Sequence, residues 1–245
     1  MNLHAIDLRD AVLPHELRER LCWLYYEEIY KPAFPIADEA EDPTVWLPLI
    51  SGVAPLPSPI VHLVLAVSDN CAPQEISAAA LLGGIIFEYF RTSKSALATY
   101  MCVRPEVRGH GVAKFLLRNA LDVIRSHTGG GSVPLFAEAE KPDEQTDAPA
   151  RALARQRLPI LSQLGFRKVP IVYRQPALGP GKHALDNLEF LVFTGGEEAS
   201  IKLWVLRGFM REFYESLDAG QPDEARMFAG LTGDTVATLA LTDHK

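Results

Sequence analysis

The 245-residue sequence lacks any apolar run approaching the roughly 18 residues of a membrane-spanning helix. Its first residues, Met1 to Asp7, carry neither the basic region nor the apolar stretch of a secretion signal. We therefore expect a cytoplasmic protein that does not bind membranes.

Cysteine is scarce, and neither cysteine nor histidine is spaced for a metal. The three cysteines, Cys22, Cys71 and Cys102, form no close pair, which argues against a disulfide framework or a metal knuckle. The seven histidines show no metal-ligand spacing. We expect reduced thiols and no metal site.

The sequence has fewer basic than acidic residues, with 24 Lys and Arg and 31 Asp and Glu, which gives a net charge of -7. Binding to nucleic acid or to an anionic membrane depends on a broad positive field, so neither partner is expected. An apolar fraction of 48% and a charged fraction of 22% are those of an ordinary globular protein.

The most informative stretch is 103–116, where an apolar run breaks at glycines and resumes with helical spacing. Residues 98–103 predict a strand, which Pro105 ends because it offers no donor to a sheet. Gly109 and Gly111 stand at the start of the following helix. Without side chains they let an anion approach the free N–H groups of the first turn, where the helix dipole also favours negative charge.

We predict that this turn binds phosphate. Arg108 can add a cationic hydrogen bond, and His110 could touch a phosphate, although an exposed loop histidine is the commoner case. The alternative is an ordinary strand-to-helix turn that uses glycine for its shape. The predicted phosphate contacts are Arg108, Gly109, His110, Gly111, Val112 and Ala113.

At this turn the chain resembles the GNAT superfamily of acetyl-CoA-dependent N-acyltransferases. The family motif reads Arg or Gln, two residues, Gly, one residue, Gly or Ala, and Arg108, Gly111 and Ala113 fill it. The family's frequent Val-x-Pro lead-in is present at 103–105, and its downstream Leu-Gly-Phe at 164–166. Segments 87–90 and 173–176 resemble, more faintly, a bacterial branch of the superfamily.

The resemblance covers about residues 10–195. It implies a GNAT-like α/β fold, with a mixed sheet of about six or seven strands flanked by helices. We predict an acyl-CoA-binding catalytic domain over 1–195 and a C-terminal helical extension over 196–245. The apolar face of a helix over 200–217 would pack on that domain or on a second subunit of a homodimer. The sequence also predicts helices over 13–30, 109–127 and 147–164 and strands over 60–67, 81–90, 96–103, 133–139, 166–174 and 188–193.

In GNAT proteins the pantetheine arm lies along the strand before the motif. The resemblance therefore implies main-chain contacts from Met101, Cys102 and Val103, and backbone donors there would stabilise a tetrahedral intermediate. Many members use a Tyr four residues before the Gly of Leu-Gly-Phe as the acid, but this chain has Leu161 there. The strand carboxylate that some members use as a base is also missing, so substitutes must come from elsewhere.

Three side chains are candidate catalytic groups. Strand parity makes Glu88 a lone carboxylate between apolar neighbours, a setting that would raise its pKa and suit a general base. Glu138 shares a strand face with Glu140 and could bind a cationic amine or pass its proton to water. Tyr173 is the candidate acid for the departing thiolate. The alternatives are exposure or pairing with Arg for the glutamates and core packing for the tyrosine.

We expect an N-acetyltransferase that passes acetyl from acetyl-CoA directly to a primary amine within a ternary complex. The acceptor would be a small molecule or an exposed protein amino group. The alternative is a catalytically silent acyl-CoA-binding sensor or partner protein, which the absent family tyrosine favours slightly. Transfer of a longer acyl chain is a third possibility.

Overall fold

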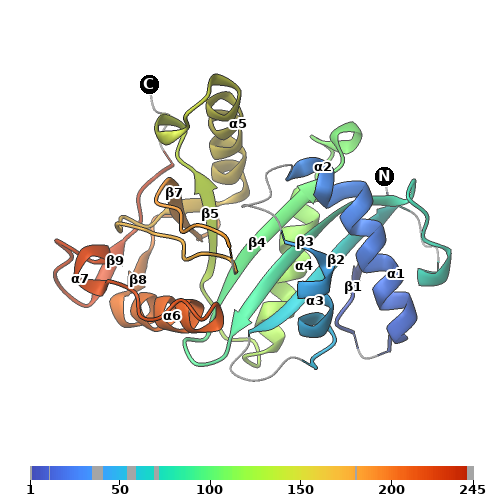
Figure 1. The fold of residues 1–245 in the computed structure, drawn as a ribbon, viewed down its shortest axis with the longest axis horizontal. Helices are drawn as coiled ribbons and strands as arrows, with labels where there is room; N and C mark the ends of the chain where they lie inside the picture. The colour runs from blue at the N-terminus through green and yellow to red at the C-terminus, as the bar shows by residue number, and fades with distance from the viewer. Residues whose placement is uncertain are drawn as a thin grey trace. The chain divides into compact units, whose positions relative to one another are not determined.

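The computed structural model describes residues 2–10, 12–34, 41–53, 59–68, 72–179 and 181–241, so Cys71 lies outside the described residues. The chain divides into two compact units. Unit 1 comprises Met1–Tyr89 and Ala98–Val133, and unit 2 comprises Phe90–Leu97 and Pro134–Lys245. A seven-stranded mixed sheet has the order β1-β2-β3-β4-β5-β7-β6, which confirms the expected α/β class (Figure 1).

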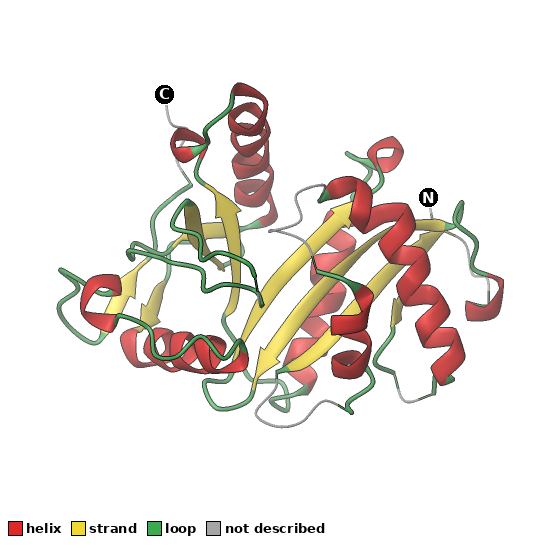
Figure 2. Ribbon diagram, viewed as in Figure 1, coloured by secondary structure: helices red, strands yellow, loops and turns green. Residues whose placement is uncertain are grey.

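Unit 1 is built on antiparallel strands. β1 (Leu3–Asp7) pairs with β2 (Ile60–Ser68), and β2 pairs with β3 (Leu81–Phe90), so that Val61 lies opposite Glu88. β4 (Ser95–Val103) follows. Apolar side chains fill most of β2 and β3 on both faces, because helices cover both sides (Figure 2).

On one face of this sheet lie α1 (His15–Tyr25), a π-helical turn η1 (Tyr26–Tyr30), α2 (Lys31–Ala33) and α3 (Pro43–Ile50). The predicted helix over 13–30 is therefore present, although its last turn is wound more widely. The Tyr25 ring is fully buried, and glycine at position 84 makes room for it. A Cβ at Gly84 would lie 2.6 Å from Cε2 of Tyr25.

On the other face lies α4 (Val112–Ser126), which contacts β1 and β2. A hydrogen-bonded chain holds the end of this helix: His62 Nδ1 lies 2.7 Å from Asp7 Oδ2, and His62 Nε2 lies 3.0 Å from His127 Nε2. A carboxylate only accepts, so Nδ1 of His62 donates to Asp7, and one of the two Nε2 atoms donates to the other. These hydrogen bonds connect β1, β2 and the end of α4.

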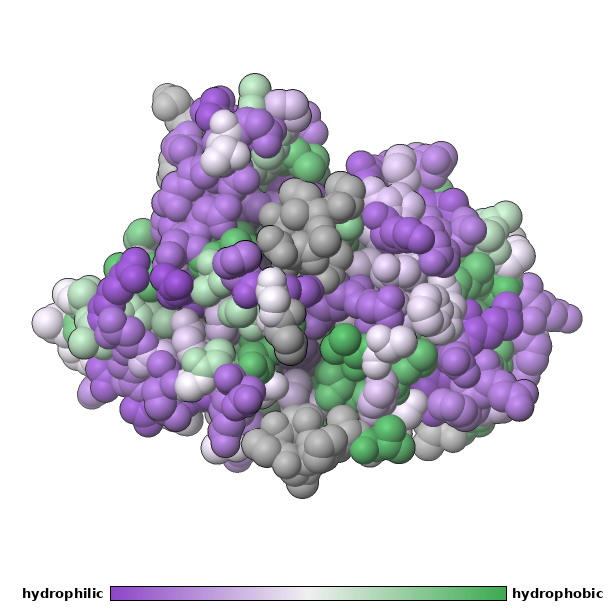
Figure 3. All heavy atoms as spheres, viewed as in Figure 1, coloured by the Kyte–Doolittle hydropathy of each residue, from purple (hydrophilic) through white to green (hydrophobic). Residues whose placement is uncertain are grey.

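Unit 2 has β7 (Leu188–Phe193) between β5 (Leu135–Glu140) and β6 (Phe166–Lys168), with antiparallel pairing on both sides. A separate two-stranded antiparallel sheet pairs β8 (Ser200–Lys202) with β9 (Thr235–Ala237). α5 (Ala148–Leu164) buries only Ala154 and Leu158, and the surface over it in Figure 3 is largely hydrophilic.

The C-terminal helix α6 (Leu203–Ser216) packs inside unit 2, and the short helix α7 (Glu224–Met227) follows it. The Phe209 ring is fully buried, with its centroid 4.7 Å from that of Phe136 and 5.7 Å from that of Phe190. The predicted helix over 200–217 is thus shorter, because its first three residues form β8. The predicted domain boundary after residue 195 stays a prediction.

Most predicted elements are present, but α3, α7, β8 and β9 were not predicted. Three further elements differ from the prediction. The strand expected over 166–174 ends at Lys168, just before Pro170, which has no N–H for a ladder. The helix expected from residue 109 begins at Val112. β1 was not predicted, since five residues that include His4 and Asp7 give little apolar pattern. No helix within the described ranges is long and apolar enough to cross a bilayer.

A substitution at Gly84 tests the packing under α1. We expect Gly84→Ala to lower the free energy of unfolding by about 1–3 kcal/mol, because the enclosed Tyr25 ring cannot move away. The control is Gly208→Ala in α6, where a Cβ would lie 3.5 Å from Ser93 Cβ and should stabilise the helix by up to ~1 kcal/mol. Urea unfolding measures both, and a stabilised Gly84→Ala would contradict the packing.

Candidate functional site

The turn between β4 and α4 has the conformation that an anion site requires. A 3-10 turn, η4 (Pro105–Val107), follows β4, and the chain then passes through Gly109 and Gly111 before α4 begins. Their φ angles are +81° and +82°, in the left-handed region that costs other residues roughly 1–2 kcal/mol. A Cβ at either glycine would meet nothing within 4 Å. Glycine is therefore needed here for the backbone conformation, and the turn is open on the outside.

The N–H groups of this turn are available to a ligand. No side chain caps the helix. Within the described part of the chain, the N–H groups of Gly109, Gly111, Val112 and Ala113 donate no hydrogen bond. Unpaired donors at the positive end of a 15-residue helix are suited to bind an anion, and the phosphate contacts stay a prediction.

The side chains of the turn add positive charge. Arg108 is exposed, donates through Nε to the Val103 carbonyl at 3.2 Å and makes no ion pair with any described residue. His110 is also exposed, and its Nδ1 lies 3.0 Å from the Arg108 carbonyl, so Nδ1 donates and Nε2 points elsewhere. Arg104 is different, because Leu81, Ala78 and Glu28 already hold its guanidinium.

The end of β4 lies tightly against β3. Met101 and Val103 are partly exposed, whereas Cys102 is 5% exposed and belongs to the core around Tyr25. A Cβ at Gly83 would lie 2.5 Å from the Cys102 carbonyl oxygen, so only glycine permits this backbone approach. The Cys102 side chain is therefore a core group, and only its backbone could contact a ligand.

The two predicted carboxylates lie in different units. Glu88 in unit 1 is partly exposed and lies opposite Val61 on β2. Val61 belongs to the core under α1, so Glu88 has the apolar strand neighbours that its parity predicted. Its expected raised pKa stays a prediction.

In unit 2, Glu138 and Tyr173 contact each other. The Tyr173 hydroxyl donates a hydrogen bond to Oε1 of Glu138, and Nε2 of Gln175 donates to Oε2 at 2.9 Å. Tyr173 is 3% exposed, and its ring stacks on Phe190 with centroids 4.8 Å apart. The structure thus brings together two of the three predicted catalytic groups and adds Gln175, which the sequence analysis did not select.

Burial governs the protonation of this cluster. It raises the pKa of the Glu138 carboxyl, while the hydrogen bonds from Tyr173 and Gln175 act in the opposite direction. Burial, together with the negative charge of Glu138, keeps the pKa of Tyr173 well above its usual range. Tyr173 therefore keeps its proton at neutral pH, and both hydrogen-bond donors to Glu138 are neutral groups.

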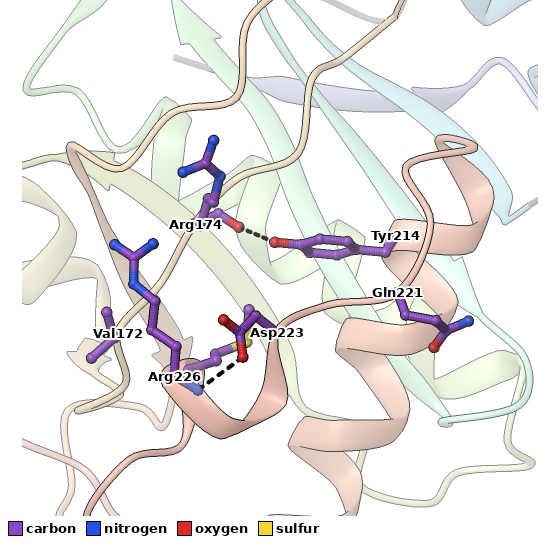
Figure 4. A pocket seen from close by; sticks show the side chains of 7 residues that line it. Val172, Arg174, Tyr214, Gln221, Asp223 and Arg226 are labelled. Carbon is purple, nitrogen blue, oxygen red and sulfur yellow. Dashed lines mark hydrogen bonds between the residues drawn. The ribbon is translucent and has the colours of Figure 1, made fainter.

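A pocket in unit 2 borders residues 172 and 174, on either side of Tyr173 in the sequence. It has a volume of about 200 Å³ and is lined by residues of the 172–174 segment, α6, α7 and the connection between these two helices (Figure 4). The Tyr214 hydroxyl donates to the Arg174 carbonyl at 2.8 Å, and Asp186 pairs with Arg174 and Arg226. Glu138 and Tyr173 do not line this pocket.

Residues 23–156 match the family described as the acetyltransferase (GNAT) family. The match spans 134 residues, counted from 23 to 156 inclusive, and so covers more than half of the 245-residue chain. The chain belongs to the acetyltransferase (GNAT) family. The resemblance drawn from the glycine turn is thereby confirmed. No curated protein matches the sequence.

Solved GNAT structures share parts of the fold. One named as a GNAT-family acetyltransferase from Bacteroides thetaiotaomicron is 16% identical, with a TM-score of 0.50 over 79% of this chain and 86% of that one. A GNAT-family structure from Desulfovibrio desulfuricans is 17% identical, with a TM-score of 0.45 over 79% and 99%. An aminoglycoside 6'-N-acetyltransferase complexed with coenzyme A is 14% identical, with a TM-score of 0.45 over 78% and 96%. At 16% identity, the likeness to the Bacteroides structure concerns the fold alone.

The GNAT assignment leaves the functional residues as predictions. Met101–Val103 and Arg108–Ala113 stay predictions as coenzyme contacts, and Glu88, Glu138 and Tyr173 stay predictions as catalytic groups. Among the described residues, no group of three or more His, Cys, Asp or Glu is placed to hold a metal ion.

A pair of variants separates the predicted phosphate binding by the turn from the effect of backbone strain at a left-handed glycine. We expect Gly111→Val to weaken CoA binding at least 10-fold, since the side chain would crowd the N–H groups. The control is Gly129→Val beyond the other end of α4, where φ is +63° and a Cβ also meets nothing within 4 Å. Both variants carry left-handed strain, but only the first should lose affinity in calorimetry. Equal affinities would refute the phosphate assignment.

Proposed function

We propose that the protein transfers the acetyl group of acetyl-CoA to a primary amine of a small molecule or protein. Membership of the GNAT family supports acyl transfer. The observation that carries the proposal is the open first turn of α4, with its unpaired N–H groups and two left-handed glycines. These features fit a pyrophosphate, which needs several donors at one concave surface.

The coenzyme would be held by the backbone at both ends of this turn. Arg108 and the unpaired N–H groups of Gly109, Gly111, Val112 and Ala113 would bind the phosphates. The main chain of Met101, Cys102 and Val103 would contact the pantetheine arm, as GNAT membership implies. Bound acetyl-CoA supplies an activated acyl group whose thiolate leaves when nitrogen attacks the carbonyl carbon.

Glu138 is suited to receive the amine. Its carboxylate has no cationic partner among the residues that the structure describes. An ammonium group could bind there and pass one proton to the carboxylate, which leaves the neutral nitrogen that acylation requires. The raised pKa of Glu138 favours this proton transfer.

Tyr173 can complete the proton balance. The bond from nitrogen to the acyl carbon forms as the bond from carbon to sulfur breaks, and the leaving thiolate needs a proton. Tyr173 holds one at neutral pH and shares a hydrogen bond with Glu138. It can donate its proton to the thiolate and be reprotonated by Glu138, which returns both groups to their starting states. The nitrogen loses its second proton to water as the amide forms, so one proton is released to solvent in each cycle. Glu88 is the alternative base, on β3.

The proposal is tested by incubation with acetyl-CoA and a panel of primary amines while free thiol is measured. We expect acceptor-dependent thiol release. Coenzyme binding without any thiol release across the panel would indicate a binding protein and contradict the proposal.

A matched pair of variants tests Glu138. We expect Glu138→Gln to lower kcat at least 100-fold while the affinity for acetyl-CoA stays unchanged, because an amide cannot accept the amine proton. Glu140→Gln is the control, since Glu140 lies on the same strand face but is ion-paired with Arg157. If Glu138→Gln keeps full activity while Glu88→Gln loses it, the base is Glu88.

The pH profile gives an independent check. Burial raises the Glu138 pKa above its ordinary 4.5, and the base is active only when ionised. The ratio kcat/KM should therefore fall as the pH drops through a pKa above 4.5. A profile that stays flat through pH 5 and below would exclude Glu138 as the base.

A further inference from the structure

We propose that Gln175 is a positioning residue that fixes the orientation of the Glu138 carboxylate and keeps it free of a cationic partner. This inference rests on the proposed function, because it assigns a role toward the proposed base. Gln175 itself would touch neither the acyl group nor the amine.

The geometry divides the two carboxylate oxygens between two donors. Tyr173 donates to Oε1, and Gln175 donates to Oε2 at 2.9 Å. The donors are two residues apart, so both reach Glu138 from the same side of one extended segment. A carboxylate bound through both oxygens cannot rotate about its terminal torsion without breaking a hydrogen bond. Each oxygen therefore keeps one defined direction for its remaining lone pair.

The segment that carries the two donors is itself anchored. The main chain of Gln175 pairs with Leu185 in both directions, at 2.8 and 3.0 Å, and the residue is 7% exposed. On one side of it, Tyr214 donates to the Arg174 carbonyl at 2.8 Å (Figure 4). Further back, the N–H of Val172 donates to the Met227 carbonyl at 3.0 Å. Gln175 can therefore direct Glu138, since its own backbone is held.

The neutral character of Gln175 distinguishes Glu138 from its neighbours on the sheet. Glu140, on the same strand, pairs with Arg157. Glu189, on β7, pairs with Lys168 at 2.7 Å. A cationic partner would compete with an ammonium ligand and would stabilise the ionised carboxylate too strongly for a base. An amide orients the carboxylate without neutralising it.

Two variants that should shift the acid limb of the pH profile in opposite directions test the role of Gln175. Gln175→Met keeps the length of the side chain but removes the donor, so we expect kcat/KM for the amine to fall 10-fold or more and its acid limb to move to higher pH. Gln175→Lys should move the acid limb to lower pH, because the ammonium would pair with Glu138. The other titratable groups in this cluster are Tyr173 and, beyond it, Tyr214, and both stay in place.

The measurement is the pH profile of kcat/KM, with thermal unfolding as a check on folding. The control is Gln145→Met, which removes an amide that donates to the Lys141 carbonyl at 3.2 Å and should leave the profile unchanged. A merely structural role would lower activity without shifting the two profiles in opposite directions. If Gln175→Met fails to fold, a profile of Gln175→Lys that does not move to lower pH overturns the proposal.

The outcomes separate this inference from the proposed function. An inactive Glu138→Gln together with an unshifted Gln175→Met profile would overturn the positioning role alone. A fully active Glu138→Gln would overturn both the role of Glu138 and that of Gln175, whereas thiol release from acetyl-CoA would still support acyl transfer.

Discussion

The left-handed backbone at Gly109 and Gly111 is the constraint on which the rest of the account depends. This backbone turns the segment that follows β4 into α4 in such a way that the first N–H groups of the helix stay unpaired. Other contacts hold the helix in place. Its buried residues pack against the sheet, and the hydrogen bond between His62 and His127 holds its C-terminal end. An open donor surface on a rigidly held helix is what a phosphate ligand requires.

The second unit contributes a different physical arrangement, a carboxylate that is partly removed from water and given only neutral partners. Burial makes the ionised form of Glu138 costly, and two hydrogen bonds compensate only in part. Such a group weakens the fold above its raised pKa, since the folded state then holds a charge that water would solvate better. Structural glutamates nearby avoid this cost through ion pairs, so the exception at Glu138 is better explained by reactivity than by stability.

Local patterns in the sequence predicted the parts of the molecule that local physics determines. The glycine turn, the strands around it and the parity of Glu88 follow from backbone preferences and the period of two. Glu138 and Tyr173 were selected separately, but their mutual hydrogen bond depends on β5, β7 and an irregular segment after Pro170 meeting in space. Gln175 was missed for the same reason, although its spacing of two from Tyr173 on an extended segment was a usable signal. β1 was missed because its pairing with β2 is non-local and its own pattern is weak.

The central claim is that the turn at the start of α4 binds the pyrophosphate of coenzyme A. Calorimetric titration of the full chain with CoA and, separately, with pantetheine tests it most directly, because pantetheine keeps the thiol arm and lacks the phosphates. The account predicts measurable heat and saturation for CoA, with an affinity that falls as salt rises, and far weaker binding of pantetheine. Equal affinities for the two, or no binding of CoA, would contradict it.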